Sequence, residues 1–254
     1  MKVLEVIKER LLFPPRQTWL KEYTENGSPP ETLKDLYRKM RIVESPRPEI
    51  IKPLLDWLRY SLELISDKLI PDKEITEILN LATGHGGLEG LIAEWAVKKG
   101  LRVKLTGIDI SQIAIDVASE VVNGRENIHF QLGDARSLDF KNKSFDLVIS
   151  NNLVHHLSER DLLLVTKEAI RVARYGIFFL DPLRCSWGIK VVGLLSRKYP
   201  EVQHEATTSF KKSYLPQELR SLIEGVSEDV GVEINVEARF PWFLCIKGNF
   251  EPID

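Results

Sequence analysis

From residue 75 onward, the sequence alternates short apolar runs with segments of helical periodicity. The apolar runs cover about residues 76–83, 102–110, 127–133, 144–151 and 175–181. Helical patterns lie between them, one with Leu88, Leu91, Ile92 and Trp95 and another with Leu162, Val165, Ala169 and Val172. Apolar strands that alternate with helices are typical of a parallel sheet covered on both faces. The pattern therefore predicts a doubly wound α/β fold.

The end of the chain carries a different strand pattern. Residues 232–238 alternate apolar with acidic and amide side chains, as in a strand at a sheet edge with one face in water. Residues 241–248 are apolar through their middle, which is typical of a buried strand. Only the short link Phe240-Pro241 separates the two segments. We therefore predict a hairpin whose last strand runs antiparallel beside the strand at 175–181.

The first part of the chain is helical in texture. Apolar side chains recur at helical spacing in residues 31–43 and 50–65, and prolines separate these segments. We predict that residues 1–74 form a helical N-terminal cap and that residues 75–254 form a Rossmann-like domain. Within this domain, residues from about 183 to 225 are expected to form a lid.

Composition is that of an ordinary globular protein and excludes several classes of function. The chain has 254 residues, of which 28% are charged, and a formal net charge of −2. This length suits one enzyme-sized α/β unit, and the charge gives no indication of nucleic-acid binding. The two cysteines, Cys185 and Cys245, stand far apart, so neither a disulfide framework nor a zinc site is predicted. We expect a cytoplasmic protein, because no apolar run suits a signal peptide or a membrane span.

The stretch "ILNLATGHGG", residues 78–87, has the form of a buried strand that enters a glycine-rich turn. Gly84 and Gly86 allow a close approach of the backbone to a ligand and tolerate positive φ. The helix that follows points its free N–H groups at the same place. This turn predicts a ligand-binding loop, although a tight connection from strand to helix has the same sequence form.

Two carboxylates follow the next two strands. Asp109 ends the second strand, where a carboxylate can accept hydrogen bonds from both hydroxyls of a ribose. Asp134 follows the third strand, where it can accept from an adenine amino group. Each aspartate alone is also compatible with a helix cap or a turn. Together with the glycine turn they predict a nucleoside site. A dinucleotide fold would need a third glycine close to the position of Glu89.

Residues from about 76 to 247 resemble the class I S-adenosylmethionine-dependent methyltransferases. The resemblance rests on "ILNLATGHG", "GIDIS", "GDA" and "FDLVISNNLVHHL", each at the end of a predicted strand. It implies a Rossmann-like seven-stranded sheet of order 3-2-1-4-5-7-6, which agrees with the hairpin at the end of the chain. The N-terminal helices and residues 209–226 are similar to small-molecule enzymes of the quinone and polyketide type, which methylate oxygen or carbon.

The resemblance implies S-adenosylmethionine as the cofactor and assigns residues to each part of it. The methionine portion would be held around Asn80, Ala82, Thr83, Gly84 and Gly86. Asp109 would bind the ribose, Ile110 would lie on one adenine face, Asp134 and Ala135 would contact the adenine edge, and Asn151 would close the site near the sulfonium.

Two positions of the loop depart from the family pattern. Asn80 stands where an acid usually helps to hold the methionine amino group, although its amide oxygen can still accept a hydrogen bond. Ala82 replaces a glycine, and its methyl group is unfavourable if the backbone there has positive φ. We expect the loop to bind S-adenosylmethionine with reduced affinity.

The segment "VHHLSERD" is similar to a stretch of plant-type O-methyltransferases in which the first histidine is the general base, here His155. Histidine suits this role because its pKa is ordinarily near neutrality. In the alternative interpretation, His155 and its neighbour only cap or pack the helix that begins after Ser158. The residues predicted to contact the acceptor are His156, Arg184, His204 and Tyr214. Spacing of the histidines predicts no metal site.

We predict methyl transfer to a small, apolar or aromatic acceptor at oxygen or carbon, by an enzyme that is a possible homodimer. One alternative is an enzyme of the same fold that modifies RNA or protein, which predicts a contiguous basic face. The other is a catalytically inactive cofactor-binding or scaffold protein, for which Asn80 and Ala82 are the sequence argument.

Overall fold

The structure is a computed structural model that describes residues 16–17, 29–43, 51–65, 75–122, 124–240 and 242–250. The strands are β1 (Thr76–Leu81), β2 (Val103–Asp109), β3 (Ile128–Leu132), β4 (Phe145–Asn151), β5 (Ala173–Pro182), β6 (Asn235–Arg239) and β7 (Phe243–Asn249). The helices are α2 (Pro30–Val43), α3 (Lys52–Leu64), α4 (Gly87–Lys98), α5 (Gln112–Val121), η2 (Val154–His156, a 3-10 turn), α6 (Glu159–Val172), α7 (Ser186–Leu195), α8 (Pro200–Lys212) and α9 (Pro216–Val230).

The strands form one seven-stranded sheet of order β3-β2-β1-β4-β5-β7-β6. Neighbouring strands from β3 to β5 are parallel, whereas β7 runs antiparallel to both β5 and β6. This arrangement confirms the predicted strand order and the predicted hairpin at the end of the chain. β6 is one of the two edge strands, and its alternating polar side chains are largely outside the core. The sheet brings the carboxyl ends of β1 to β4 to one edge, where the glycine turn and both predicted acids are found.

Serine side chains cap the beginnings of two helices. Ser111 caps α5, with its hydroxyl oxygen accepting a hydrogen bond from the Ala114 N–H at 3.4 Å. Ser158 caps α6 by accepting from the Asp161 N–H at 3.1 Å. Such side-chain acceptors satisfy backbone donors that have no partner within the helix. Both helices therefore start directly after a loop of the predicted site.

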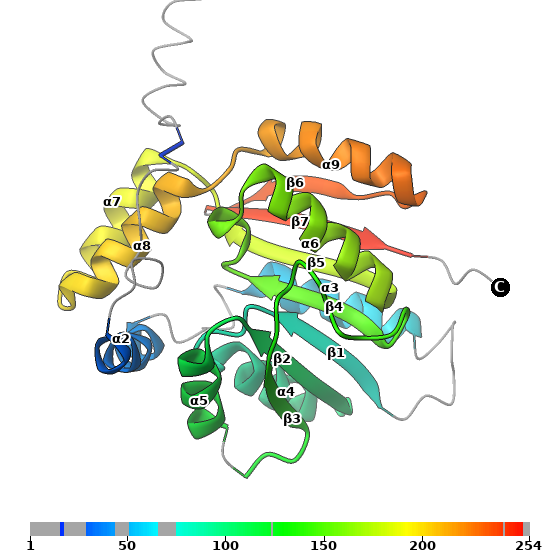
Figure 1. Ribbon diagram of the computed structural model, residues 1–254, viewed down its shortest axis with the longest axis horizontal. Coiled ribbons are helices and arrows are strands. Elements are labelled where there is room, and N and C mark those ends of the chain that lie inside the picture. Colours follow the sequence, from blue (N-terminus) through cyan, green and yellow to red (C-terminus); the bar gives the residue numbers. More distant parts are fainter. Residues whose placement is uncertain are drawn as a thin grey trace, which may run out of the picture.

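Helices cover both faces of the sheet (Figure 1). On one face, α6 and α9 bury apolar side chains such as Leu162, Val165 and Ile223 against the sheet. On the other face, α3 and α4 pack with side chains such as Leu58 and Ile92. Each face of the sheet therefore has its own core. Because both faces are covered, the central strand β4 is buried at every residue except the last.

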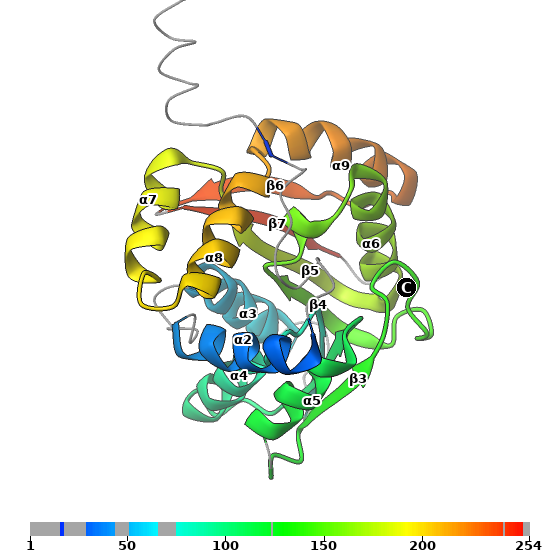
Figure 2. The same ribbon diagram turned by 60° about the vertical axis from the view of Figure 1, so that its left-hand side comes forward.

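Three further helices lie beyond the edge where the parallel strands end. α7 and α8 pack on each other, and α2 contacts both α8 and α5 (Figures 1 and 2). The predicted N-terminal cap is described only in part, and its two helices differ in position: α3 lies on the sheet beside β5, whereas α2 lies over the carboxyl edge. α2 and α8 therefore stand where a cover of the site is needed.

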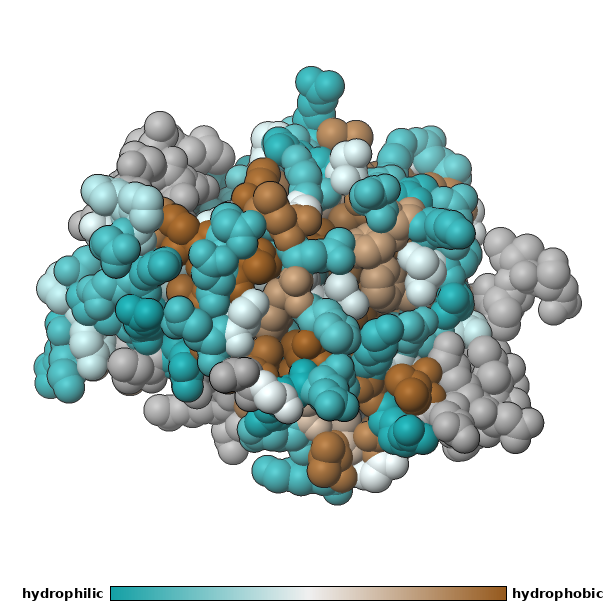
Figure 3. All heavy atoms as spheres, turned by 60° about the horizontal axis from the view of Figure 1, so that its bottom comes forward, coloured by the Kyte–Doolittle hydropathy of each residue, from teal (hydrophilic) through white to brown (hydrophobic). Residues whose placement is uncertain are grey.

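Polar residues make up much of the face shown in Figure 3, with hydrophobic residues in groups between them. Some large apolar side chains of the molecule are well exposed, among them Ile110, Leu132, Leu194 and Leu195. Within the described part of the chain, no helix is both long enough and apolar enough to cross a bilayer.

Trp57 packs α3 against the sheet, so its substitution tests this packing. Its ring lies 5.2 Å from that of Phe178, and its Nε1 donates to Asn249 Oδ1 at 2.9 Å. Because Trp57→Ala removes a buried ring and a hydrogen bond, we expect the free energy of unfolding in urea to fall by about 3–5 kcal/mol. Tyr60→Ala is the matched control, since Tyr60 is exposed on the same helix. Equal losses in the two variants would contradict this account of α3.

Candidate functional site

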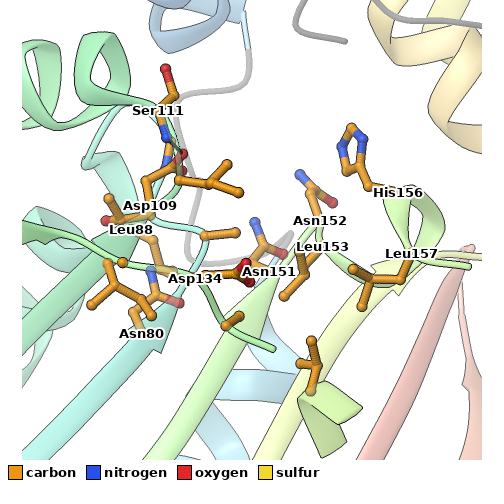
Figure 4. A pocket seen from close by; sticks show the side chains of 18 of the residues that line it. Asn80, Leu88, Asp109, Ser111, Asp134, Asn151, Asn152, Leu153, His156 and Leu157 are labelled. Atoms are coloured by element: carbon orange, nitrogen blue, oxygen red, sulfur yellow. Dashed lines mark hydrogen bonds between the residues drawn. The ribbon is translucent and has the colours of Figure 1, made fainter. Parts of the chain in front are cut away.

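A cavity of about 420 Å³ lies at the carboxyl ends of β1 to β4. Asn80 and Asp109 are on one side of it and His156 and Leu157 on the other (Figure 4). The loops after β1, β2, β3 and β4 line it with Asn80, Ala82, Thr83, Gly84, His85, Leu88, Ile108, Asp109, Ile110, Ser111, Gly133, Asp134, Ala135, Arg136, Asn151, Asn152, Leu153, His155, His156 and Leu157. Tyr37 and Met40 of α2, Asp161 and Val165 of α6 and Ser209 of α8 complete the lining.

The glycine turn has a left-handed backbone at three positions. φ is 59° at Ala82, 55° at Gly84 and 73° at Gly86. A Cβ atom at Gly86 would lie 2.8 Å from the Cβ of Ala118, so this glycine is also required by the packing of α5. The alanine at residue 82 therefore sits in a conformation that favours glycine, as the departure from the family pattern predicts.

Asp109 joins the loops after β1 and β2. Its Oδ2 accepts from the Gly84 N–H and its Oδ1 from the Ser111 N–H, both at 2.9 Å. Burial raises the pKa of Asp109, and these two backbone hydrogen bonds oppose the rise. A carboxylate has about four acceptor positions. Asp109 thus holds the two loops in place and retains acceptor capacity toward the cavity.

Asp134 lines the same cavity but is engaged by Arg136. The guanidinium Nη2 lies 2.7 Å from Oδ2, and its Nε lies 3.0 Å from Oδ1. The Arg136 guanidinium lowers the pKa of Asp134, which is therefore ionised near neutrality. The pair is partly exposed at the rim of the cavity. A ligand that uses Asp134 as an acceptor has to share this carboxylate with Arg136.

A buried polar cluster lies beneath the glycine turn. Glu89, from the first turn of α4, has no solvent exposure, and its Oε1 accepts from Asn80 Nδ2 at 2.6 Å and from the Thr83 hydroxyl. Burial raises the pKa of Glu89, while the hydrogen bonds from Thr83 and Asn80 lower it in part. Asn80 and Thr83 line the cavity, and Glu89 stands directly behind them.

The segment after β4 carries a histidine that is paired with an acid. His155 is 1% exposed yet contributes to the cavity lining, and its Nδ1 lies 3.1 Å from both oxygens of Asp181. Asp181, near the end of β5, also accepts from the Val154 N–H at 3.1 Å. The acid therefore fixes both the ring of His155 and the turn that carries it. Such pairing selects the tautomer in which Nδ1 bears the proton.

Two other histidines of the site have different surroundings. The His156 ring lies 4.1 Å from that of His155, centroid to centroid, and it lines the cavity. His85 is half-buried in the glycine turn, and its Nδ1 accepts from the Gly87 N–H at 3.2 Å. Burial lowers the pKa of His85 to about 4, so this ring is neutral at pH 7.

Three residues predicted to contact the acceptor lie outside the lining of this cavity. Arg184 donates to the Ser213 carbonyl at 3.0 Å and to Glu218 Oε1 at 2.6 Å, which ties the start of the lid segment to α9. Tyr214 is 1% exposed and donates to the Leu157 carbonyl at 3.2 Å. His204 is exposed on α8. Both Nη atoms of Arg184 and the hydroxyl of Tyr214 are thus already used within the protein.

Three residues of the site were not predicted from the sequence to belong to it: Arg136, Asp181 and Glu89. Asp181 had a detectable signal, since it stands near the end of a predicted parallel strand as Asp109 does. Arg136 and Glu89 are recognised only by the side chains they meet. Among the described residues, no group of three or more histidine, cysteine or acidic side chains is arranged to hold a metal ion.

Residues 78–176 match the family model described as "Methyltransferase domain". Among curated proteins, the chain is similar to the ubiquinone biosynthesis O-methyltransferases of Bartonella quintana, with 27% identity over 61% of this chain and 63% of the relative, and of Bartonella bacilliformis, with 30% identity over 56% of each. The chain thus spans about 60% of the length of these relatives. A crystal structure of a SAM-dependent methyltransferase from Aquifex aeolicus has the same fold, with a TM-score of 0.56 and 16% identity over 88% of this chain and 100% of that one.

The matched domain and the strand order agree with each other. Residues 78–176 match a methyltransferase domain, and the sheet around them has the strand order expected for the class I S-adenosylmethionine-dependent methyltransferases. The family model covers the stretch from β1 into β5, which includes the glycine turn and the segment with His155.

The left-handed backbone at Ala82 predicts a stabilising substitution. Ala82→Gly removes the methyl group that makes a φ of 59° unfavourable, so we expect the free energy of unfolding to rise by about 1 kcal/mol. Urea denaturation measures the difference. Ala96→Gly is the control, because glycine inside α4 is expected to lower stability by about 1 kcal/mol or more. Destabilisation by both substitutions would show that residue 82 is not strained.

Proposed function

We propose that this protein binds S-adenosylmethionine in the cavity and transfers its methyl group to a small, apolar or aromatic acceptor at oxygen or carbon. The observation that carries the proposal is the position of Asp109. It is held by two backbone N–H groups at the carboxyl end of β2, and it retains acceptor positions directed at a cavity that Asn80 and Asp134 also line.

The residues present suit each part of this cofactor. Asp109 is placed to accept from the ribose hydroxyls. Ile110 is 68% exposed where it borders the cavity, and a large apolar side chain gains burial when a flat adenine ring covers it. Asn80 provides an amide oxygen on the wall of the cavity. Asn151, at the end of β4, stands beside them and is expected to close the site near the sulfonium.

When bound, the cofactor supplies an activated methyl group, so the protein's main tasks are alignment of the acceptor and exclusion of water. Tyr37 and Met40 of α2 and Ser209 of α8 border the cavity from the side opposite the sheet. We infer that α2 and the segment of α7 and α8 cover the site during transfer. α7 and α8 belong to the predicted lid at about residues 183–225, and α2 belongs to the predicted N-terminal cap.

We infer that His155 acts as the general base when the acceptor is a hydroxyl group. Asp181 holds Nδ1, so the ring presents Nε2 as its basic atom and can take a proton from the acceptor oxygen. Asp181 acts as a positioning residue that stabilises the charged ring. His156, next to it on the cavity wall, is placed to contact the acceptor.

The nature of the acceptor is inferred from the lining and from the relatives. Leu153 and Leu157, each two residues from His155 in the chain, are apolar members of the cavity lining, which suits an apolar or aromatic molecule. The relatives named for ubiquinone biosynthesis are O-methyltransferases, and they support oxygen as the methylated atom. An apolar wall provides few directional contacts, so shape rather than hydrogen bonding is expected to select the acceptor.

Cofactor binding is tested by calorimetric titration with S-adenosylmethionine. We expect binding to the unmodified protein and an affinity about 100-fold lower for Asp109→Ala, because two hydrogen bonds to the ribose and the anchor of the glycine turn are lost. Asp116→Ala, an exposed acid on the following helix, is the control and should bind as the unmodified protein does. Absence of binding by the unmodified protein would remove the enzyme function.

The role of His155 is tested by turnover of hydroxyl-bearing aromatic acceptors. We expect His155→Ala to slow transfer by about 100-fold or more while cofactor affinity stays unchanged, because only proton removal is lost. Asp181→Asn should slow transfer and shift its pH profile, since the ring loses its charged partner. His129→Ala, an exposed histidine on β3, serves as the control. If His155→Ala turns over at the normal rate, the residue is only structural.

A further inference from the structure

We propose that Glu89 supplies, from helix α4, the negative charge that strand β1 lacks at Asn80, and that the two side chains together bind the α-ammonium group of the cofactor. Asn80 is the direct contact and Glu89 is the positioning residue behind it. This inference rests on the proposed cofactor. It adds Glu89 as a charged partner for the methionine portion of the cofactor. The sequence pattern around Asn80 does not indicate this partner.

The hydrogen bonds of the cluster set the orientation of the Asn80 amide. The Asn80 side chain turns its Nδ2 toward Glu89 Oε1, 2.6 Å away, because the amide nitrogen donates and the carboxyl oxygen accepts. The Thr83 hydroxyl donates to the same oxygen. The amide oxygen Oδ1 is therefore directed away from Glu89. Asn80 itself lines the cavity.

Two acceptor atoms in this cluster point to a cationic ligand. Among the described residues, Asn80 Oδ1 and Glu89 Oε2 are buried and have no hydrogen-bond partner. Asn80 is 1% exposed and Glu89 has no exposure, and a buried acceptor without a donor is costly. An ammonium group has three donors and a positive charge. It would satisfy the amide oxygen directly and the carboxylate through its field.

The packing around Glu89 shows that the position of its carboxylate is closely fixed. Gly107 on β2 pairs with Asn80 on β1, and a Cβ at Gly107 would lie 2.8 Å from Glu89 Oε1 and 2.6 Å from the Thr83 hydroxyl oxygen. The carboxylate thus occupies space that is free only because residue 107 is glycine. Loop, helix and both strands meet at this one charged group.

A purely structural cluster would have the same hydrogen bonds, so the test has to depend on the ammonium group. We would measure, by calorimetry, the affinities of S-adenosylhomocysteine and of its deaminated analogue, in which hydrogen replaces the α-amino group. For the unmodified protein, loss of the amino group should weaken binding by about 10- to 100-fold, as expected for a charge-assisted hydrogen bond.

Glu89→Gln keeps the size of the side chain and removes its charge. We expect it to weaken binding of S-adenosylhomocysteine by about tenfold or more and to leave the affinity for the deaminated analogue unchanged. Glu94→Gln is the matched control, because Glu94 is an exposed acid on the same helix, paired with Arg125. It should change neither affinity.

The double variant Asn80→Asp with Glu89→Gln returns the acid to the strand and should restore preference for the amino group, even if the single variant folds poorly. Equal weakening of both ligands by Glu89→Gln, or no weakening of either, would overturn the proposal. So would a double variant that binds both ligands equally. If the unmodified protein binds neither ligand, the proposed cofactor is wrong. If it binds both with equal affinity, only the role of Glu89 and Asn80 is refuted.

Discussion

The carboxylate of Asp109 is the contact on which the site depends. It accepts from the Gly84 N–H of one loop and the Ser111 N–H of the next, so it sets the distance between the turn after β1 and the start of α5. Each of these N–H groups would otherwise lack a partner at a helix entrance or a tight turn. The Asp109 carboxylate, which joins the two loops, also faces the cavity. The structural role and the proposed binding role are therefore combined in one side chain.

The glycine turn contains a residue with an unfavourable backbone conformation and lies on a buried polar side chain. Ala82 has a left-handed backbone, and the turn sits on a carboxylate, Glu89, that is removed from solvent. Both features cost stability. They persist because the surrounding elements determine the conformation: Gly86 packs against Ala118, and Gly107 leaves the space that Glu89 and Thr83 fill. Costly local features that the fold maintains are often found where a ligand completes the interactions.

Much of the fold was accessible from the sequence because its signals are local. Strand and helix periodicity and the alternating edge strand each depend on neighbours in the chain, and the structure confirms them. The strand ends likewise located Asp109 and Asp134, which line one cavity. The partners of these groups were not accessible. Asp181 and Glu89 gain their significance from contacts between different elements, whereas Arg136 contacts Asp134 from two residues away in the same loop. Arg184 and Tyr214 are engaged by residues distant in the chain and lie outside the cavity lining.

The two halves of the cavity are built on different principles, and this difference bears on specificity. The half formed by β1 to β3 holds charged and amide groups in fixed positions, each with backbone or side-chain partners. The half that carries His155 includes the apolar residues Leu153 and Leu157, and α8, which contacts the turn of His155, adds Ser209 from outside the sheet. Fixed polar groups discriminate strongly, because a wrong ligand leaves them unpaired, whereas an apolar wall distinguishes molecules mainly by volume. The first half thus suits one constant ligand. Substitutions on α8 alter the second half without changing the sheet, so the proposed choice of acceptor is separable from the proposed binding of the cofactor.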